Sequence, residues 1–272
     1  KKLIPTIEIV EMDLTDVNYI NELIQYFGPD EIYNFAAYSN VFNPWDNLES
    51  VFEINCKIPQ NFLKSIVQED KNIKFFQASS ALIFGRTDTH EQDEKTAFAP
   101  LYPYGITKLY SHNLINEFRE KYGLFCCAAI YFNHESERRG NNFFTKKVIN
   151  GIKEIQNNKK DKLVVGDLTA YRDMGYAPDY MEATYAMMQN SIPVDYVVGT
   201  GNLIKMEDFI EKSFAAANLD WRDYIVYDSN FSRPQETQKL KANIKKIQNE
   251  LGWYPKNNID SIIHQMIEKT GE

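Results

Sequence analysis

The sequence predicts a doubly wound α/β protein, in which helices cover both faces of a parallel sheet. Two observations lead to this prediction. Short apolar segments alternate with longer amphipathic segments through the first half of the 272 residues, and the short segments are apolar at nearly every position. Strands of that kind are buried on both faces, as in a parallel sheet, whereas half-exposed strands alternate apolar and polar residues. A hydrophobic content of 43% is enough to build such a core.

The elements of the first half follow a regular order. The expected strands are 7–12, 31–37, 73–79 and 125–132, and the expected helices between them are 17–26, 47–67 and 103–121. The carboxyl ends of parallel strands meet at one edge of the sheet, where doubly wound proteins bind their ligands. Functional residues are therefore expected just past the four strands, after Met12, Ala36, Ser79 and Phe132.

The second half has shorter and more polar elements. The expected helices are 142–157, 180–190, 206–217, 244–251 and 259–269, and the expected strands are 162–165, 196–199 and 224–228. We therefore divide the chain into a Rossmann-type dinucleotide-binding unit, 1–133, and a smaller C-terminal α/β lobe, 134–272, which binds substrate and returns some strands to the sheet.

Composition excludes several classes of protein. The net charge of −8 argues against a nucleic-acid partner, which needs a basic surface. The three cysteines, Cys56, Cys126 and Cys127, suit neither a disulfide framework nor a metal site, and no metal is expected. The longest apolar stretch, 124–132, is too short to cross a bilayer, and no signal peptide opens the chain. We expect a cytoplasmic protein with no membrane partner.

A Tyr-x-x-x-Lys pair carries the first chemical signal. Tyr104 and Lys108 lie four residues apart, and hence on one helical face, directly after Tyr102-Pro103. Upstream, an expected strand ends in Ser79-Ser80. A serine after a strand and Tyr-x-x-x-Lys on the next helix resemble the catalytic constellation of the short-chain dehydrogenases. The expected catalytic residues are Ser80, Tyr104 and Lys108.

The residue types suit removal of a proton from an alcohol. A phenol ionises near pH ~10, which is too high for a base at neutral pH. We expect the Lys108 ammonium and an oxidised nicotinamide to favour the phenolate and lower the pKa of Tyr104. Tyr104 would then take the proton of a sugar hydroxyl while hydride leaves the same carbon, and Ser80 would orient that hydroxyl.

Further strings extend from Asp13 almost to the C-terminus. The narrowest are Phe132-Asn133-His134-Glu135-Ser136, Arg138-Arg139-Gly140, and Arg172-Asp173 followed by Gly175-Tyr176-Ala177-Pro178-Asp179-Tyr180. Together with Tyr104 and Lys108 they resemble the GDP-mannose 4,6-dehydratase family, which belongs to the extended short-chain dehydrogenases and to the NAD-dependent epimerase/dehydratase superfamily. The similarity implies a homo-oligomer, dimer or tetramer, that pairs through the helices near 47–67 and 103–121.

The resemblance implies roles position by position. NAD or NADP would contact Asp13, Leu14, Phe35, Ala36, Ala37, Ser39, Tyr104, Lys108, His134 and Arg139. A nucleotide-sugar substrate, most simply a GDP-sugar, would be held by Asn133, Lys147, Arg172, Arg233 and Glu236. Guanidinium groups suit the oxygens of a pyrophosphate, which an acidic protein must meet with a local cluster of cations.

The sequence departs from the family at its beginning. The family opens with a GxxGxxG turn between the first strand and helix, and no such turn is present, so the expected fold lacks its N-terminal βαβ unit. The amides of that turn bind the cofactor pyrophosphate, and the strand end that discriminates NAD from NADP lies in the same unit. We expect the numbered chain to be a fragment, and both cofactors stay open.

A second departure concerns the reaction. Leu82 occupies the position of the family's catalytic glutamate, which removes the C5 proton and helps to expel the C6 hydroxyl, and leucine moves no proton. Three functions therefore remain open. The first is a 4,6-dehydratase-like enzyme in which another group replaces the carboxylate, with Glu135 and His90 nearest in sequence. The second is a nucleotide-sugar 4-oxidoreductase or epimerase, and the third a homologue that binds nucleotide sugar without turnover.

Overall fold

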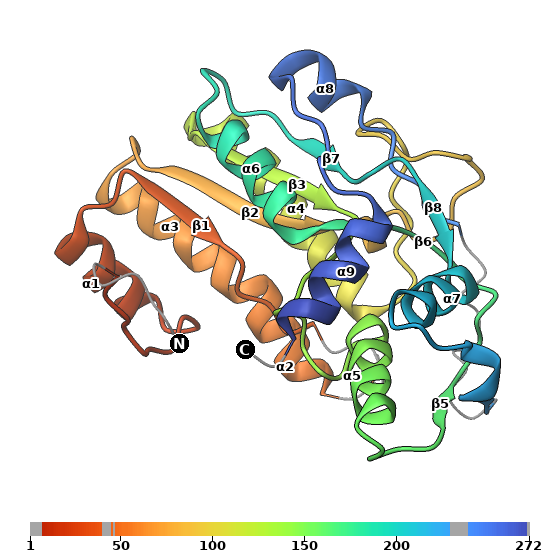
Figure 1. The fold of residues 1–272 in the computed structure, drawn as a ribbon. Helices are drawn as coiled ribbons and strands as arrows, with labels where there is room; N and C mark the ends of the chain where they lie inside the picture. Colours follow the sequence, from red (N-terminus) through yellow and green to blue (C-terminus); the bar gives the residue numbers. More distant parts are fainter. Residues whose placement is uncertain (1–6, 40–44, 46, 229–238, 271–272) are drawn as a thin grey trace.

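A four-stranded parallel sheet forms the centre of the protein (Figure 1). The structure is a computed structural model, and it describes residues 7–39, 45, 47–228 and 239–270. The strands are β1 (Glu31–Asn34), β2 (Lys74–Ser80), β3 (Cys126–Tyr131) and β7 (Tyr196–Val198), in that spatial order.

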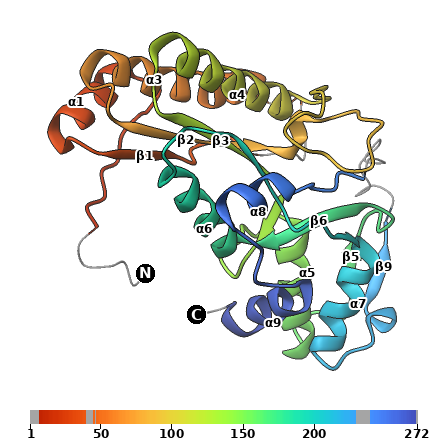
Figure 2. The same cartoon turned by 90° about the horizontal axis from the view of Figure 1, so that it is seen from above.

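Helices cover both faces of this sheet (Figure 2). On one face lie α1 (Val17–Phe27), α3 (Ile58–Glu69) and α4 (Pro103–Tyr122), and on the other lies α6 (Ala177–Met188). Neighbouring residues of β2 serve different cores, because Phe75 packs under α3 while Phe76 packs toward α6. Both faces are buried, which explains why apolar residues point to both sides of the strand. The predicted doubly wound fold is confirmed.

The predicted strand 7–12 is wrong. These residues form no strand, and the side chains of Ile7, Ile9 and Val10 are 52%, 63% and 45% exposed. A strand needs a neighbour for its backbone hydrogen bonds, and among the described residues no segment pairs with this one. β1 pairs with β2 alone within the same part of the chain.

The predicted helix 47–67 is a composite. It begins as α2 (Leu48–Phe52), widens into a π-helical turn at Glu53–Lys57 and continues as α3. A π-turn inside an α-helix often marks a functional position.

The C-terminal half adds two small sheets. One consists of β4 (Asn133–Glu135), β6 (Tyr171–Tyr176) and β8 (Leu203–Lys205), and the other pairs β5 (Leu163–Val165) with β9 (Ile225–Tyr227). Three helices, α5 (Phe144–Gln156), α7 (Met206–Ala216) and α9 (Ile259–Lys269), pack against one another there, and α8 (Lys245–Leu251) lies beside β7. The strands β4, β6 and β8 were not predicted, because all three carry polar or charged residues and because β4 and β8 are only three residues long.

The chain crosses between the two halves more than once. After leaving the sheet at β3 it builds β4, α5, β5 and β6, and then returns through α6 and β7 to the central sheet. In the part of the chain that the structure describes, no helix is both long and apolar enough to span a membrane. The same residues contain no cluster of potential metal ligands, and all three cysteines are free thiols.

Candidate active site

Ser80, Tyr104 and Lys108 meet at the carboxyl end of β2. Ser80 is the last residue of β2, and its hydroxyl accepts a 3.2 Å hydrogen bond from the Leu82 amide, which caps a short 3₁₀ turn at Ala81–Ile83. α4 begins with Pro103 in its first turn, where a missing N–H costs nothing. The second residue of that turn is Tyr104, and Lys108 follows one turn later.

Lys108 points at the strand and not at solvent. Its ammonium donates a 2.8 Å hydrogen bond to the carbonyl oxygen of Ala78 and lies 5.7 Å from the centroid of the Tyr104 ring. Only 3% of the lysine is exposed, and this burial lowers the pKa of Lys108 to about 8.

The phenol of Tyr104 is made a weaker acid by the protein. Burial raises its pKa to about 12, and this effect exceeds the opposing influences of the Ser80 hydroxyl and of the Arg139 charge. The expectation that the Lys108 ammonium lowers this pKa is therefore wrong for the protein side chains alone. The cation that favours the phenolate is Arg139.

Two residues hold α4 close to β2. Gly105 lets the helix approach the 3₁₀ turn, since a Cβ at this position would lie 2.7 Å from the Leu82 carbonyl oxygen. Asn55 lies in the π-turn, and its side-chain amide donates a 3.0 Å hydrogen bond to the Thr107 hydroxyl. The side-chain oxygen of Asn55 accepts a 2.8 Å hydrogen bond from the Tyr38 backbone amide. The loop after β1 is thereby joined to the catalytic helix. Sequence reasoning missed Asn55, and a buried amide in an amphipathic helix is the one signal that could have revealed it.

The loop after β1 contains the predicted cofactor contacts. Phe35 is 45% exposed and packs against Phe76, with ring centroids 5.5 Å apart. The Ala36 amide donates to the Asn34 side chain at 3.1 Å, Ala37 is half-buried, and Ser39 is exposed.

Asp13 and Leu14, the other predicted contacts at this end, lie before α1. The Asp13 carboxylate accepts hydrogen bonds from the hydroxyl and amide of Thr15 at 2.7 and 2.9 Å, which lower its pKa. Leu14 packs into the core beneath α3.

His134 and Arg139 come from β4 and the loop after it. The His134 Nδ1 lies 3.0 Å from the Phe132 carbonyl oxygen, and burial lowers its pKa to about 4, so the imidazole is neutral at physiological pH. The guanidinium of Arg139 stacks 3.7 Å above the Phe143 ring, and its Nε lies 3.3 Å from the Glu135 carboxylate.

The side chains at this edge fit a dinucleotide cofactor. One buried polar atom next to Ser80 in the sequence, the Ser79 hydroxyl oxygen, makes no hydrogen bond within the described residues. Buried polar groups are normally satisfied, so this hydroxyl is available to a ligand. The residues that would hold NAD(P) are those of the β1 loop, Tyr104, Lys108, His134 and Arg139.

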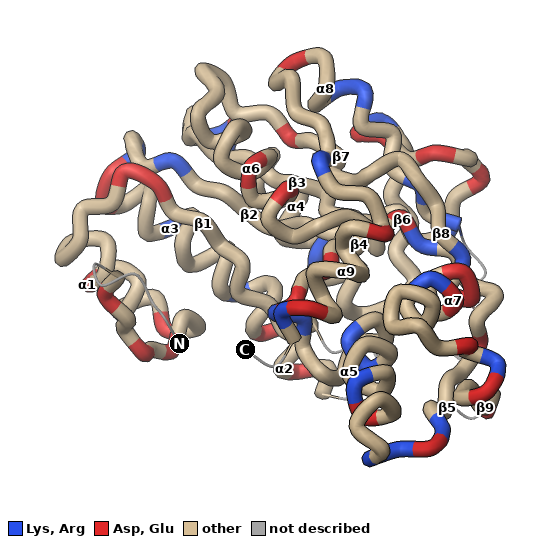
Figure 3. Tube along the Cα trace, viewed as in Figure 1, with Lys and Arg blue, Asp and Glu red and all other residues tan. Residues whose placement is uncertain are grey.

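Three of the predicted substrate residues lie on β4, α5 and β6. Asn133 is the first residue of β4, and its carbonyl oxygen accepts a 3.2 Å hydrogen bond from the Tyr180 hydroxyl. Lys147 is exposed on α5. The Arg172 guanidinium on β6 donates a 2.7 Å hydrogen bond to the Tyr171 carbonyl oxygen. Figure 3 shows basic positions along α5 and beside β6 and β8. Arg233 and Glu236 lie outside the described residues.

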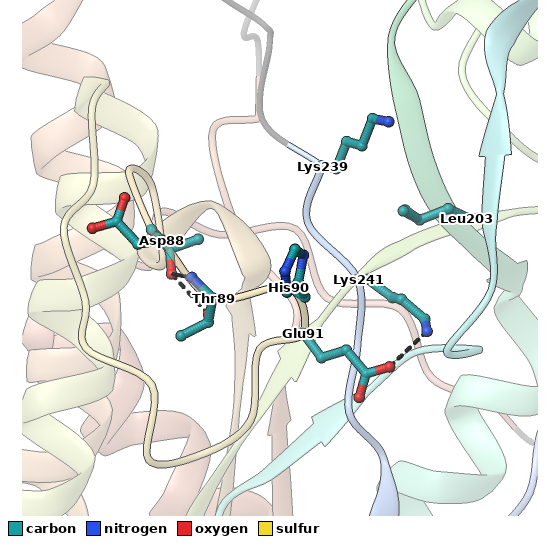
Figure 4. Close-up of a pocket in the computed structure, with 8 residues that line it drawn as sticks. Asp88, Thr89, His90, Glu91, Leu203, Lys239 and Lys241 are labelled. Carbon is teal, nitrogen blue, oxygen red and sulfur yellow. Dashed lines mark hydrogen bonds and ion pairs between the residues drawn. The ribbon is translucent and has the colours of Figure 1, made fainter.

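A polar cleft of about 500 Å³ opens beside β8. Its walls are the 87–91 loop, which follows the catalytic serine turn, and the segment of Lys239 and Lys241 (Figure 4). Lys241 pairs with Glu91 at 2.6 Å, and the Lys239 ammonium lies 4.0 Å from the Tyr171 ring centroid. The cleft therefore borders the strand that carries Arg172.

Two buried polar residues hold these walls together. Gln92 is fully buried, and its backbone and side chain hydrogen-bond to Lys241 at 2.8 and 2.7 Å. The carboxylate of Asp173 on β6 accepts hydrogen bonds from the amides of Thr200, Gly201 and Ala242, at 2.8 to 3.0 Å. These hydrogen bonds join the cleft wall at Lys241 and Ala242 to Gln92 and to β6, and neither residue was predicted from the sequence.

Leu82 and the two candidate replacements for the family glutamate lie in different surroundings. Leu82 lies in the 3₁₀ turn, two residues after Ser80, and is 38% exposed. Glu135 is 2% exposed, and its carboxylate accepts a 2.5 Å hydrogen bond from the Thr145 hydroxyl. The same carboxylate forms an ion pair with Arg139. His90 lines the polar cleft.

The sequence and the fold are both similar to those of known proteins. The sequence matches the family described as GDP-mannose 4,6 dehydratase over residues 1–266. GDP-mannose 4,6 dehydratase 2 of Arabidopsis thaliana is 35% identical over 261 residues, which cover 94% of this chain and 70% of that protein.

Solved structures share the fold. RMD from Pseudomonas aeruginosa, complexed with NADPH, has a TM-score of 0.87 and 20% identity over 96% of this chain and 87% of its own. The dTDP-glucose 4,6-dehydratase of Bacillus anthracis, in complex with NAD, has a TM-score of 0.83 and 18% identity over 96% of this chain and 78% of its own. At these identities the structural similarities establish the fold alone.

Proposed function

The chain belongs to the GDP-mannose 4,6-dehydratase family, and on that premise we propose that it acts on GDP-mannose or a related GDP-sugar as a 4,6-dehydratase-like enzyme. It is an NAD(P)-dependent enzyme of the nucleotide-sugar dehydratase and epimerase type. The observation that carries the proposal is the meeting of Ser80, Tyr104 and Lys108 at the carboxyl end of β2.

The proposed chemistry begins at C4 of the sugar. The Ser80 hydroxyl orients the C4 hydroxyl, and the Tyr104 phenolate takes its proton. NAD(P), when bound, accepts the hydride from the same carbon. Lys108 fixes the position of α4 against β2 through its bond to the Ala78 carbonyl.

The substrate is proposed to extend from this site over the C-terminal lobe. Lys147 on α5 and Arg172 on β6 supply cations toward its diphosphate, with Arg233 and Glu236 beyond them in the sequence. Support comes from the polar cleft, whose 87–91 loop follows the Ser80 turn in the sequence and whose Lys239 packs on Tyr171, the neighbour of Arg172.

Leu82 favours a second candidate, a nucleotide-sugar 4-oxidoreductase or epimerase. Oxidation at C4 needs only Ser80, Tyr104 and Lys108, whereas loss of water across C5 and C6 needs a further group that moves a proton. Among the described carboxylates, Glu135 is committed to Thr145 and Arg139.

Incubating the chain with GDP-mannose and NAD(P) in deuterated water separates these functions. A 4-keto-6-deoxy product with deuterium at C5 supports the dehydratase. A change at C4 with the C6 hydroxyl retained supports the oxidoreductase or epimerase. Tight binding by the wild type without any turnover contradicts both, and Tyr104→Phe serves as the inactive control.

We also propose that the chain forms a homo-oligomer through α2 and α4, which contact each other. Leu48 and Phe52 lie one turn apart on α2, and Ile106 and Tyr110 one turn apart on α4, and all four side chains are 38% to 44% exposed. Exposed apolar side chains gathered on adjacent helices are typical of a protein interface. Sedimentation of Phe52→Glu/Tyr110→Glu should give a monomer, and an unchanged oligomer would contradict this proposal.

A further inference from the structure

Gly175 and Tyr180 belong to one of the sequence strings that resemble the family, and neither has a role in the proposed steps. Gly175 lies on β6 directly opposite His134 of β4. A Cβ at Gly175 would lie 2.5 Å from Cε1 of the Tyr180 ring, closer than real Cβ atoms approach. The missing side chain at Gly175 therefore leaves space for the Tyr180 ring beside His134, with ring centroids 5.3 Å apart.

Two tyrosine rings hold the imidazole of His134. The Tyr131 ring centroid lies 5.4 Å from the imidazole, and the rings of Tyr131 and Tyr180 are stacked on each other at 5.8 Å. Tyr180 is fully buried, and its hydroxyl donates a 3.2 Å hydrogen bond to the Asn133 carbonyl oxygen, which ties its ring to β4. Aromatic rings at these separations attract one another. The orientation of the imidazole is thereby fixed.

The hydrogen bond of His134 determines which of its nitrogens carries the proton. Nδ1 lies 3.0 Å from the Phe132 carbonyl oxygen, which can only accept, so Nδ1 is the protonated nitrogen. Burial lowers the pKa of His134 to about 4, so the neutral ring has a single N–H. Nε2 is consequently an acceptor, and it makes no hydrogen bond to a described residue. A ligand at Nε2 must supply an N–H or O–H donor.

His134 lies at the edge of the sheet where the proposed catalytic residues meet. Tyr131 is the register partner of Ser80 in the pairing of β2 with β3, and His134 follows three residues later. Ring contacts continue from Tyr131 to Phe76 at 6.1 Å, and from Phe76 to Phe35 in the loop after β1 at 5.5 Å. The imidazole is partly exposed at the carboxyl ends of parallel strands, where doubly wound proteins bind dinucleotides.

We propose that Gly175 and Tyr180 are positioning residues, which hold His134 with Nε2 unprotonated so that this nitrogen accepts a hydrogen bond from NAD(P). The inference rests on the proposed function only in placing the nicotinamide at this edge. The donors available there are the N–H of the carboxamide and the O–H of the adjoining ribose. His134 contacts the cofactor directly, and Gly175 and Tyr180 act only through His134.

Nitrogen NMR of ¹⁵N-labelled histidine tests the tautomer in the full chain without any ligand. The chain has four histidines, and the His134 signals are those that His134→Phe removes. Nδ1 should give the signal of a protonated nitrogen, and Nε2 that of an unprotonated one. A protonated Nε2 in the wild type overturns the proposal.

Variants of the two positioning residues are compared in the same spectra. Tyr180→Phe keeps the ring beside His134 and should leave the tautomer unchanged. Gly175→Ala displaces that ring and should give a mixture of both tautomers. Tyr180→Leu removes the ring, should have the same effect, and serves as the second variant if Gly175→Ala does not fold. An unchanged tautomer in the folded variants overturns the positioning roles.

Cofactor binding tests the role of Nε2, and calorimetry with NAD and NADP measures it in the absence of a sugar nucleotide. His134→Phe keeps a flat ring but has no acceptor, so the affinity should fall roughly tenfold, because a donor of the cofactor is left unpaired. His134→Gln retains an acceptor and should keep part of the affinity. His264→Phe changes an exposed histidine on α9 and should bind like the wild type. Wild-type affinity in His134→Phe overturns the proposal.

An analogue of the cofactor identifies the donor. 3-Acetylpyridine adenine dinucleotide has a methyl ketone in place of the carboxamide and so lacks its N–H. If the carboxamide is the donor, the wild type should bind the analogue roughly tenfold more weakly than NAD, and His134→Phe should bind both alike. If the ribose is the donor, the wild type should bind both alike, and His134→Phe should bind both more weakly. Either result supports the proposal.

These measurements need no turnover, which keeps the inference separate from the proposed function. A chain that binds NAD(P) through Nε2 and converts no GDP-mannose supports the inference and contradicts the proposed function. A chain that converts GDP-mannose with a protonated Nε2 does the reverse. A wild type that binds neither NAD nor NADP overturns the inference.

Discussion

The Lys108 ammonium lies 5.7 Å from the centroid of the Tyr104 ring, while its hydrogen bond, 2.8 Å long, goes to the Ala78 carbonyl. The lysine therefore anchors α4 to the sheet, and the phenol remains the group that is proposed to act on the substrate. Replacement of Tyr104 should therefore lower turnover, whereas replacement of Lys108 should change the pH dependence of stability.

Tyr104→Phe should lower kcat by about 10²–10⁴-fold, because the group that takes the proton is gone while the shape of the site is kept. The affinity for the nucleotide sugar should change little, since the diphosphate is proposed to be held elsewhere. Stopped-flow measurement of turnover and calorimetric measurement of binding check the two statements. A variant that keeps wild-type turnover would remove Tyr104 from the mechanism.

Lys108→Met should reveal the cost of the buried ammonium through the pH dependence of stability. The pKa of Lys108 is lowered from 10.5 to about 8 by burial, so between these values the unfolded chain binds a proton that the folded protein has released. The free energy of unfolding of the wild type, relative to the variant, should therefore rise as pH increases from about 8 to 10.5, by on the order of 3 kcal/mol.

Urea unfolding of both proteins at several pH values measures this difference. The comparison with the variant is essential, because buried tyrosines and cysteines titrate in the same range and act with the opposite sign. A difference that stays flat with pH would mean that the lysine keeps an ordinary pKa in the folded protein.

Gly105→Ala should disturb the site without adding or removing a charge. A Cβ at Gly105 would lie 2.7 Å from the Leu82 carbonyl oxygen, closer than real Cβ atoms approach, and the obstacle is backbone. We expect a loss of about 1–3 kcal/mol in stability and a fall in kcat, because the 3₁₀ turn that Ser80 caps must move away from Tyr104.

Gly123→Ala provides the matched control for this variant. Gly123 has a φ of 67° at the end of the same helix, and no heavy atom lies within 4 Å of a Cβ there. That substitution should cost stability through its backbone conformation alone and leave kcat unchanged. Equal kcat in both variants would show that the contact between Gly105 and Leu82 does not position the site.

The central sheet could be predicted because the amino-acid composition of its strands reflects their burial on both faces. The segments 73–79 and 125–132 place apolar residues on both faces, and the structure buries both faces. Tyr171–Tyr176 escaped prediction for the opposite reason: Arg172 and Asp173 make it polar, and Asp173 is nevertheless buried by the amides that it bonds. Local pattern cannot indicate a strand whose charge is satisfied by distant backbone.

The site could be predicted only as far as spacing along one element allows. Tyr104 and Lys108 share a helix, so their common face follows from the sequence. The effect of their surroundings does not follow, since it depends on burial and on Arg139, which joins the site from another element. The pKa of the Tyr104 phenol was expected to be lowered, and burial raises it instead. Asn55 and Gln92 were missed for the same reason, because their partners lie far along the chain.

Leu82→Glu should increase elimination of water from GDP-mannose. Leu82 follows the catalytic serine by two residues and is 38% exposed, so a carboxylate there stays partly hydrated and ionised. It would supply the missing group that removes a proton at C5 once C4 is a ketone. We expect the yield of 4-keto-6-deoxy product, with deuterium taken up at C5, to rise at least about tenfold over the unsubstituted chain.

Leu82→Gln is the matched control. Its side chain has nearly the same shape as that of Leu82→Glu but contains no base, and it should show no gain. A Glu variant that binds GDP-mannose normally and reduces NAD(P) in a single turnover, yet yields no more elimination than the Gln variant, would show that position 82 does not limit the second half of the reaction.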